Sequence, residues 1–342
     1  MQLAKDVRRT AAIGAVAGAV LLALRKRNRY SPYGKAVLIT GGSRGLGLVL
    51  AREFANRGAF VAVCARNDED LERVRKEFSE NGAHFLALRC DLTKQDDVVT
   101  MIDSVEQQLG PIDVLVNNAG TIQMGPLENQ TIEDFREAME NFWSAVYTSL
   151  TMAPRMKNRH AGRIVNIASI GGKVAVPHLL PYCASKFALI GFSKGLRAEL
   201  AKDGVCVTTA VPGLMRTGSP RNVLVAGQHT KEYGWFILGD SLPGISMNAK
   251  RAARKIVNAC VRGRSEVVIG LPAKGAAMIE AFAPNFNSMM FAAVNRWMLP
   301  GPGDSAHKQK GFESESSLTK SVLTSLTRRA EIENNELGSE AT

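Results

Sequence analysis

The chain has 342 residues, 45% of them hydrophobic, which is enough for one large core or two modest ones. Its formal net charge of +11 would suit a nucleic-acid partner, but the charge is unevenly spread. Residues 1–30 hold seven bases and one acid, residues 303–342 hold five bases and seven acids, and the other bases form no run interleaved with aromatics. We therefore expect no nucleic-acid partner. The five cysteines and five histidines show no ligand spacing, so we expect no metal site.

Residues 11–24 form an apolar stretch that is followed at once by a basic cluster from Arg25 to Arg29. The stretch is shorter than the ~20 residues that cross a bilayer core. Basic residues after the stretch favour retention of the following chain in the cytoplasm. We therefore interpret residues 1–30 as an N-terminal anchor or interfacial helix, with the catalytic domain on the cytoplasmic side. A helix packed on the protein or on a partner, and a cleaved signal peptide, are the alternatives.

From residue 31 onward, short apolar runs alternate with helical patterns. The runs lie at 36–40, 60–65, 84–89, 113–117, 163–167, 205–211 and 266–269. This alternation predicts a Rossmann-type doubly wound parallel sheet of about seven strands, with helices on both faces, over residues 31–270. Each strand is short and continuously apolar, as expected when both faces of a sheet are covered.

Two further segments follow this predicted domain. Residues 271–302 are rich in Met, Phe and Ala but broken by Pro284. We expect an apolar pair of helices there that widens a pocket rim or lies on a membrane. Residues 303–342 are rich in Ser, Thr, Glu and Lys, which predicts a mobile polar tail. Within it, Leu318, Val322 and Leu326 could line one face of a short helix.

A glycine-rich turn joins the first predicted strand to the first predicted helix. It reads Gly41-Gly-Ser-Arg-Gly-Leu-Gly47. Such a turn lets backbone amides approach a pyrophosphate at the helix N-terminus. A tight strand-to-helix turn without a ligand is the alternative, since the spacing differs from the common dinucleotide fingerprint.

The end of the second predicted strand indicates which dinucleotide binds. An NAD enzyme usually has an acid there to bind the ribose hydroxyls, whereas this chain has Arg66, and Arg44 lies in the glycine-rich turn. Two guanidinium groups would favour the added phosphate of NADP(H). The alternatives are that both are surface arginines, or that Asp68 allows some use of NAD.

A third pattern places Tyr182 and Lys186 four residues apart, on one face of a helix. A nearby ammonium stabilises a phenolate, so we expect the lysine to lower the pKa of the tyrosine towards working pH. Tyr182 would then serve as general acid in reduction and general base in oxidation. Taken alone, the spacing occurs on many helices.

Together these residues resemble the short-chain dehydrogenase/reductase family over about residues 35–270. The motifs that carry the resemblance occur in family order, and Ser169 lies thirteen residues before Tyr182, the customary family interval. They are Thr40 to Gly47, Asp91 in Cys-Asp-Leu-Thr, Asn117-Asn-Ala-Gly120, Asn141, Ser169, Tyr182 with Lys186, and Pro212-Gly213-Leu-Met-Arg-Thr217.

The resemblance implies roles for four catalytic residues. Tyr182 would exchange the proton with the substrate oxygen, Lys186 would lower its pKa, and Ser169 would bind the carbonyl oxygen. Asn141 would hold a water that links Lys186 to solvent, although Trp143 after it departs from the small residue often found there. The implied cofactor-binding residues are Gly41, Ser43, Arg44, Gly45, Leu46, Gly47, Arg66, Asp91, Asn118, Tyr182, Lys186, Pro212, Gly213 and Thr217.

The sequence thus predicts an NADP(H)-dependent carbonyl reductase or alcohol dehydrogenase. Residues 214–242 would cover the nicotinamide, and their apolar side chains suggest a small apolar carbonyl or alcohol substrate; a dimer contact or core is the alternative. The family resemblance implies a homodimer or homotetramer. Two other functions stay open: a different reaction on the same fold, such as epimerisation or enoyl reduction, and a membrane-tethered NADPH-binding protein without turnover.

Overall fold

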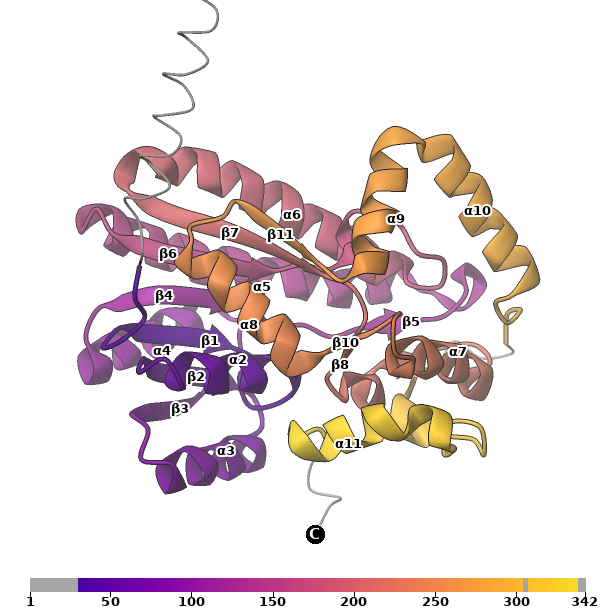
Figure 1. The fold of residues 1–342 in the computed structure, drawn as a ribbon, viewed down its shortest axis with the longest axis horizontal. Coiled ribbons are helices and arrows are strands. Elements are labelled where there is room, and N and C mark those ends of the chain that lie inside the picture. The colour runs from indigo at the N-terminus through magenta and orange to yellow at the C-terminus, as the bar shows by residue number, and fades with distance from the viewer. Residues whose placement is uncertain (1–29, 304–306, 338–342) are drawn as a thin grey trace, which may run out of the picture.

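The computed structural model describes residues 30–303 and 307–337. Seven parallel strands form the central sheet, in the spatial order β11-β7-β6-β4-β1-β2-β3. The strands are β1 (Ala36–Thr40), β2 (Phe60–Ala65), β3 (Phe85–Arg89), β4 (Ile112–Asn117), β6 (Gly162–Ile167), β7 (Val205–Pro212) and β11 (Glu266–Ile269). All seven predicted apolar runs are strands of this sheet, which confirms the predicted doubly wound fold (Figure 1).

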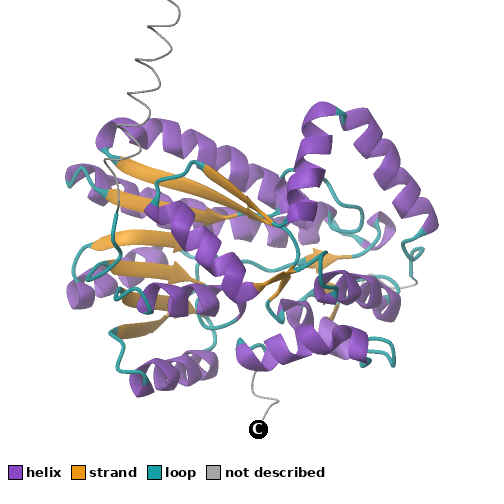
Figure 2. Ribbon diagram, in the orientation of Figure 1, coloured by secondary structure: helices purple, strands orange, loops and turns teal. Residues whose placement is uncertain are grey.

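Helices cover both faces of the sheet (Figure 2). One face carries α2 (Gly45–Ala55), α3 (Asp68–Glu80) and α8 (Ala249–Val261), and the other carries α4 (Gln95–Leu109), α5 (Ile132–Asn158) and α6 (Leu180–Leu200). Successive residues of β1 point to opposite faces, so Val37 and Ile39 join the first core and Leu38 joins the second. The two cores are mainly apolar, which explains why the strands read as continuous hydrophobic runs.

Smaller elements extend the carboxyl edge of the sheet. Two short strand groups join β5 (Gln123–Met124) to β9 (Leu224–Val225) and β12 (Gln309–Lys310), and β8 (Met215–Arg216) to β10 (Met247–Asn248). The remaining helices are α7 (His229–Ser241), α9 (Leu271–Phe282), α10 (Pro284–Trp297) and α11 (Ser325–Glu333). The apolar extension is therefore a pair of helices, α9 and α10, which project together from the body of the molecule (Figure 1).

The C-terminal segment differs from the predicted mobile tail. Residues 307–337 pack on α7 and on the carboxyl edge of the sheet, where Thr327, Ala330 and Glu331 are buried. The predicted helical stripe is also corrected. Leu318 and Val322 precede α11, and both are exposed, as is Leu326 within it. Small polar side chains supply the buried contacts instead, which a search for apolar periodicity does not detect.

A buried polar network fixes α5 and α6 to the sheet. Asn166 on β6 accepts a hydrogen bond from Asn117 Nδ2 on β4 (2.8 Å) and donates from Nδ2 to Ser193 Oγ on α6 (3.0 Å). Thr148 on α5 donates to Asn117 Oδ1 (2.6 Å), and Thr209 on β7 donates to Ser193 Oγ (2.7 Å). The network therefore crosslinks three strands and the two helices that carry Asn141 and Tyr182.

We expect Asn166→Ala to lower the free energy of unfolding by about 2 kcal/mol, because buried partners lose a hydrogen bond that no water replaces. Urea unfolding followed by circular dichroism measures this change. Gln107→Ala, at an exposed position of α4, is the control and should leave stability unchanged within about 0.5 kcal/mol. Equal midpoints for the two variants would show that the network is not coupled to stability.

Candidate active site

The glycine-rich turn lies at the carboxyl end of β1, beside the point where the strand order reverses between β1 and β4. Gly41 and Gly45 have positive φ, of 62° and 56°. A Cβ at Gly47 would lie 2.1 Å from Gly41 O, and one at Gly41 would lie 2.8 Å from Ala119 Cα. Larger residues are excluded at both positions, so the backbone stays bare where α2 begins. This bare, amide-lined turn fits the pyrophosphate of a dinucleotide.

The turn after β4 is tied to the glycine-rich turn. Thr40 Oγ1 accepts hydrogen bonds from Asn118 N (3.0 Å) and Ala119 N (3.1 Å). Asn118 Nδ2 donates to Thr40 O (3.1 Å) and Gly41 O (3.0 Å). Asn118 thus sits at the predicted cleft, and its amide holds two loops in register.

The two predicted phosphate-binding arginines occupy the expected edge. Arg44 precedes α2 and Arg66 follows β2, and both are exposed. Asp91 follows β3 and accepts hydrogen bonds from Thr93 N (3.1 Å) and Thr93 Oγ1 (2.8 Å). Burial raises the pKa of Asp91, but the bonds from Thr93 and the charges of Lys94 and Arg66 outweigh it, so the pKa is lowered. Asp91 is therefore a charged acceptor at the same edge as Arg66.

The four predicted catalytic residues come together at the carboxyl ends of β4 and β6. Ser169 follows β6 and lies beside Tyr182 near the start of α6, since a Cβ at Gly171 would lie 3.4 Å from Tyr182 Cε1 and 3.6 Å from Ser169 Oγ. Lys186 lies one helical turn further, with Nζ 5.6 Å from the centre of the Tyr182 ring. Asn141 on α5 reaches the same place, since a Cβ at Gly120 would lie 3.2 Å from Asn141 Oδ1 and 3.5 Å from Lys186 Nζ.

Burial governs the protonation of this cluster. Burial raises the pKa of Tyr182 to about 12, and the hydrogen bond from Ser169 offsets only part of that effect. Burial also lowers the pKa of Lys186 to about 8, and Lys186 Nζ donates to Ile167 O (3.1 Å). The phenol of Tyr182 is therefore protonated at neutral pH.

Asn141 and the final motif are held by backbone contacts. Asn141 Oδ1 accepts from Thr121 N (2.8 Å), and Nδ2 donates to Thr121 O (2.9 Å). Pro212 ends β7, and Gly213 N donates to Ile269 O (2.9 Å). Thr217 is buried, and its hydroxyl donates to Ser219 Oγ (2.8 Å). All these positions open onto the carboxyl edge of the sheet.

Sequence reasoning missed a buried pair beside the catalytic helix. His178 Nδ1 lies 2.8 Å from Glu232 Oε1, and Trp235 Nε1 donates to Glu232 Oε2 (2.8 Å). The pair joins the loop before Tyr182 to α7. His178 has a positive φ of 63°, but this backbone conformation is not evident from the sequence. The apolar residues of α7 pack on the same loop, where Tyr233, Phe236 and Ile237 form a core with Leu179 and Cys183.

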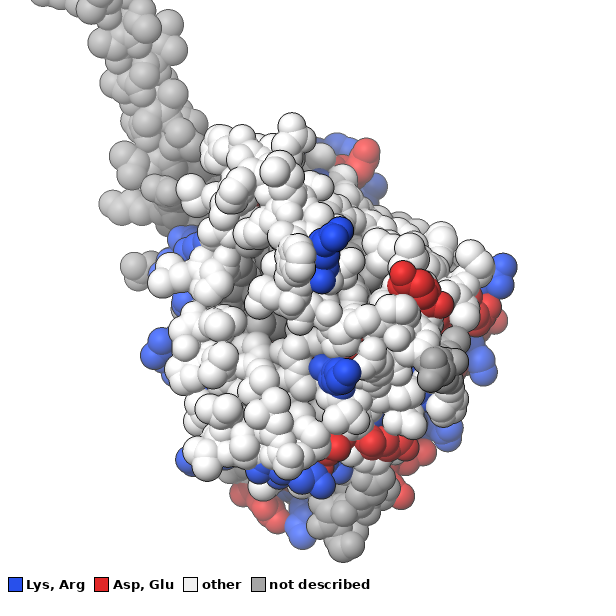
Figure 3. Space-filling view, turned by 90° about the vertical axis from the view of Figure 1, so that its right-hand side faces the viewer, with Lys and Arg blue, Asp and Glu red and all other residues white. Residues whose placement is uncertain are grey.

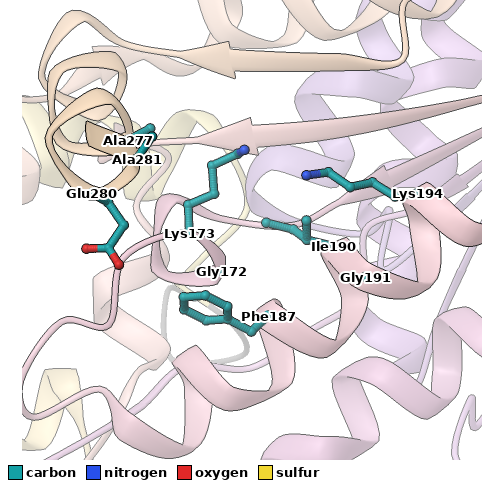
Figure 4. A pocket seen from close by; sticks show the side chains of 9 residues that line it. All are labelled: Gly172, Lys173, Phe187, Ile190, Gly191, Lys194, Ala277, Glu280 and Ala281. Atoms are coloured by element: carbon teal, nitrogen blue, oxygen red, sulfur yellow. The ribbon is translucent and has the colours of Figure 1, made fainter. Parts of the chain in front are cut away.

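A separate cavity lies between α6 and α9, with a volume of about 390 Å³ (Figure 4). Phe187, Ile190 and Gly191 of α6 form one wall, and Ala277, Glu280 and Ala281 of α9 form another. Lys173 and Lys194 enter it, and both pair with Glu266. Ser169, Tyr182 and Lys186 do not line this cavity, so it is distinct from the catalytic cluster.

Comparison with known proteins agrees with this geometry. A profile of the short chain dehydrogenase family matches residues 35–224. The Anopheles gambiae dehydrogenase/reductase SDR family protein 7-like is 36% identical over 274 residues, which are 78% of this chain and 85% of that protein. A gluconate 5-dehydrogenase from Burkholderia cenocepacia, solved with NADP and tartrate, is 26% identical with a TM-score of 0.63, over 74% of this chain and 99% of that one.

An actinorhodin polyketide ketoreductase solved with NADPH is 29% identical, with a TM-score of 0.62 over 69% of this chain and 95% of that one. The family profile covers more than half of the sequence and lies on the sheet and helices that hold the catalytic cluster. The chain therefore belongs to the short-chain dehydrogenase/reductase family of oxidoreductases.

Proposed function

We propose that this chain is an NADP(H)-dependent oxidoreductase acting on a carbonyl/alcohol pair, with Tyr182 as general acid and base. The observation that carries the proposal is the meeting of Ser169, Tyr182 and Lys186 at the sheet edge that also holds the bare glycine-rich turn. A dinucleotide held at that turn supplies the hydride. The solved relatives that contain NADP and NADPH support this cofactor.

In the reducing direction, the carbonyl carbon gains the hydride and the carbonyl oxygen gains the proton of Tyr182. The Ser169 hydroxyl donates a hydrogen bond to the same oxygen as negative charge develops on it. The high pKa of Tyr182, about 12, keeps the proton in place until that charge appears. Lys186, whose pKa is about 8, then returns a proton to Tyr182. The polar groups of Asn141 and Thr121 provide the path for this proton.

An apolar substrate fits the surroundings of the catalytic cluster. Ile122 and Val176 are partly exposed and flank the segments that hold Asn141 and Tyr182, and Trp235 of α7 packs with them. Tyr233, Phe236 and Ile237 pack in a core. Fewer apolar side chains of residues 214–242 can therefore contact a substrate than we expect from the sequence. Exposed Trp143, Leu150 and Phe187 on α5 and α6 support a homodimer or homotetramer through these helices.

The intact cluster argues against the two alternative functions. A pure NADPH-binding protein has no chemical need for a phenol that lies beside the Ser169 hydroxyl and near the Lys186 ammonium. Epimerisation and enoyl reduction are less favoured because Ser169, Tyr182 and Lys186 are all present in the arrangement that suits carbonyl chemistry. We therefore rank carbonyl/alcohol chemistry first.

We expect Tyr182→Phe to reduce turnover of aryl and long-chain aliphatic ketones with NADPH by about 10²–10⁴-fold, because the proton donor is lost. Cofactor affinity, measured by NADPH fluorescence, should stay within about threefold of wild type. Glu199→Gln, at an exposed position near the end of α6, is the control for helix integrity. Turnover that survives Tyr182→Phe would rule out the proposed acid and favour another reaction on this fold.

We expect Arg66→Asp to weaken NADPH binding by at least about tenfold and to leave NADH binding unchanged or tighter, because the new carboxylate repels the extra phosphate. Fluorescence titration with both nucleotides measures the ratio of the two Kd values. Arg262→Asp, at the opposite edge of the sheet, changes the net charge equally and should not alter that ratio. Equal effects of the two substitutions would assign Arg66 to general surface charge.

Membrane association is a further part of the proposal. Among the residues that the structure describes, no helix is long and apolar enough to cross a membrane, and the apolar segment 11–24 lies outside them. However, α9 and α10 expose Phe282 (85%), Met289 (72%) and Trp297 (76%) on one side of the molecule. Figure 3 shows that this side carries few charged groups. We propose that it rests on a membrane surface, with the catalytic domain facing the cytoplasm.

We expect Phe282→Ser combined with Trp297→Ser to reduce co-sedimentation of the full chain with phosphatidylcholine/phosphatidylserine vesicles by about fivefold or more, because about 2 kcal/mol of burial is lost for each large side chain. Leu127→Ser, at an exposed apolar position before α5, should have no effect. Unchanged sedimentation would show that α9 and α10 do not contact the lipid.

A further inference from the structure

The C-terminal segment ends on the glycine-rich turn. Its α11 packs along α7, where Thr327 Oγ1 lies 2.7 Å from Ser241 Oγ (Figure 1). A Cβ at Gly218 would lie 2.6 Å from Glu331 Cα, so the segment runs directly over the loop that follows β8. The chain then crosses to α2 and α3, more than 260 residues away in sequence.

Two asparagines bond to the turn itself. Gly45 N, the first amide of α2, donates to Asn334 O (2.9 Å), and Asn334 Nδ2 donates to Thr217 O (3.0 Å). Asn335 Nδ2 donates to Ser43 O (2.8 Å), and Asn335 Oδ1 accepts from Arg73 Nε (2.7 Å). These contacts use the helix N-terminus that the proposed cofactor requires for its pyrophosphate.

A carboxylate lies where a phosphate would be expected. Glu336 is only 4% exposed, and its Oε1 is 2.5 Å from the position that a Cβ on Gly45 would take. Its Oε2 accepts from Asn222 Nδ2 (2.7 Å) and lies 3.7 Å from Arg44 Nε. The side chain of Glu336 thus lies beside a helix N-terminus and a guanidinium, the groups that commonly surround a bound phosphate.

We propose that residues 331–337 are a self-inhibitory segment that fills the pyrophosphate and adjacent ribose part of the cofactor site and must leave it before NADP(H) binds. The inference rests on the proposed function, since it assigns a regulator to the same site. The predicted cofactor-binding residues Ser43, Arg44, Gly45 and Thr217 each contact the segment. The nucleotide and the segment therefore compete. The apparent affinity for NADP(H) is the affinity of the open form multiplied by the fraction of molecules that are open.

The charges around the segment indicate that its closure is adjustable. Burial raises the pKa of Glu336 to about 7 and of Glu331 to about 7. Arg44 before α2 and Arg221 before β9 face Glu336 and lower its pKa, whereas Asp70 of α3 raises it. The charges of Arg221 and Arg328 lower the pKa of Glu331. The charges of Glu315 and Glu336 raise it. Because both closed-state values are raised, closure is strongest below the ordinary carboxyl pKa and weakens as the pH rises through about 7.

The test compares NADPH binding by the full chain and by its Asn335→Ala/Glu336→Ala variant. We expect the variant to bind NADPH at least about tenfold more tightly, since the closed state loses two sets of bonds to the turn. Ile332→Ala changes an exposed position of the same segment and should bind like wild type. Hydrogen exchange of the wild-type chain is the second measurement. Amides in 331–337 should exchange faster once NADPH is saturating, because the segment has been displaced.

Each other outcome is decisive. Equal NADPH affinity for both chains, with exchange in 331–337 unaffected by NADPH, would overturn the self-inhibitory segment and leave the proposed function intact. Weaker binding by the double variant, with slower exchange in the segment on adding NADPH, would also overturn it, since the segment would then be part of the cofactor site. Absence of NADPH and NADH binding in every variant would overturn both the proposed function and the inference.

Discussion

The site depends on the close approach of two backbone turns at the carboxyl ends of β1 and β4. Gly47 can approach Gly41 only because neither has a side chain, and Thr40 and Asn118 bond the two turns together. This contact leaves the turn before α2 without side chains at Gly41, Gly45 and Gly47, where the strand order reverses. Arg66, Asp91 and Thr217 follow the ends of neighbouring strands, and Tyr182 and Lys186 lie near the start of α6.

The catalytic cluster is placed by a second constraint, which lies in the core. The polar network of Asn117, Asn166 and Ser193 fixes α5 and α6 against the same strands that carry the turns. Tyr182 and Ser169 are therefore set at a fixed distance from the glycine-rich turn, although they come from different elements. The buried pair His178 and Glu232 adds a link to α7, so the cover of the site is joined to the loop before the catalytic helix.

The sequence predicts the sheet well because each strand is an apolar run with both faces covered. All seven runs are strands, and their ends differ by at most one residue from those expected. The glycine spacing and the Tyr182/Lys186 pair also predict which residues meet. The protonation of Tyr182 could not be predicted in this way, because it depends on burial, and a sequence contains no direct record of how much water reaches a phenol.

The contacts of the C-terminal segment could not be predicted from the sequence. Its composition is that of a mobile tail. Asn334 and Asn335 each form a hydrogen bond with the glycine-rich turn at the other end of the chain, and Glu336 lies 3.7 Å from Arg44 of that turn. Such contacts bury little apolar surface, so they leave no periodic pattern. They hold the segment because the turn presents the Gly45 amide and the Ser43 carbonyl, and because Arg44 presents a positive charge. The features that suit the turn to a dinucleotide are thus the same ones that hold the chain's own C-terminal segment.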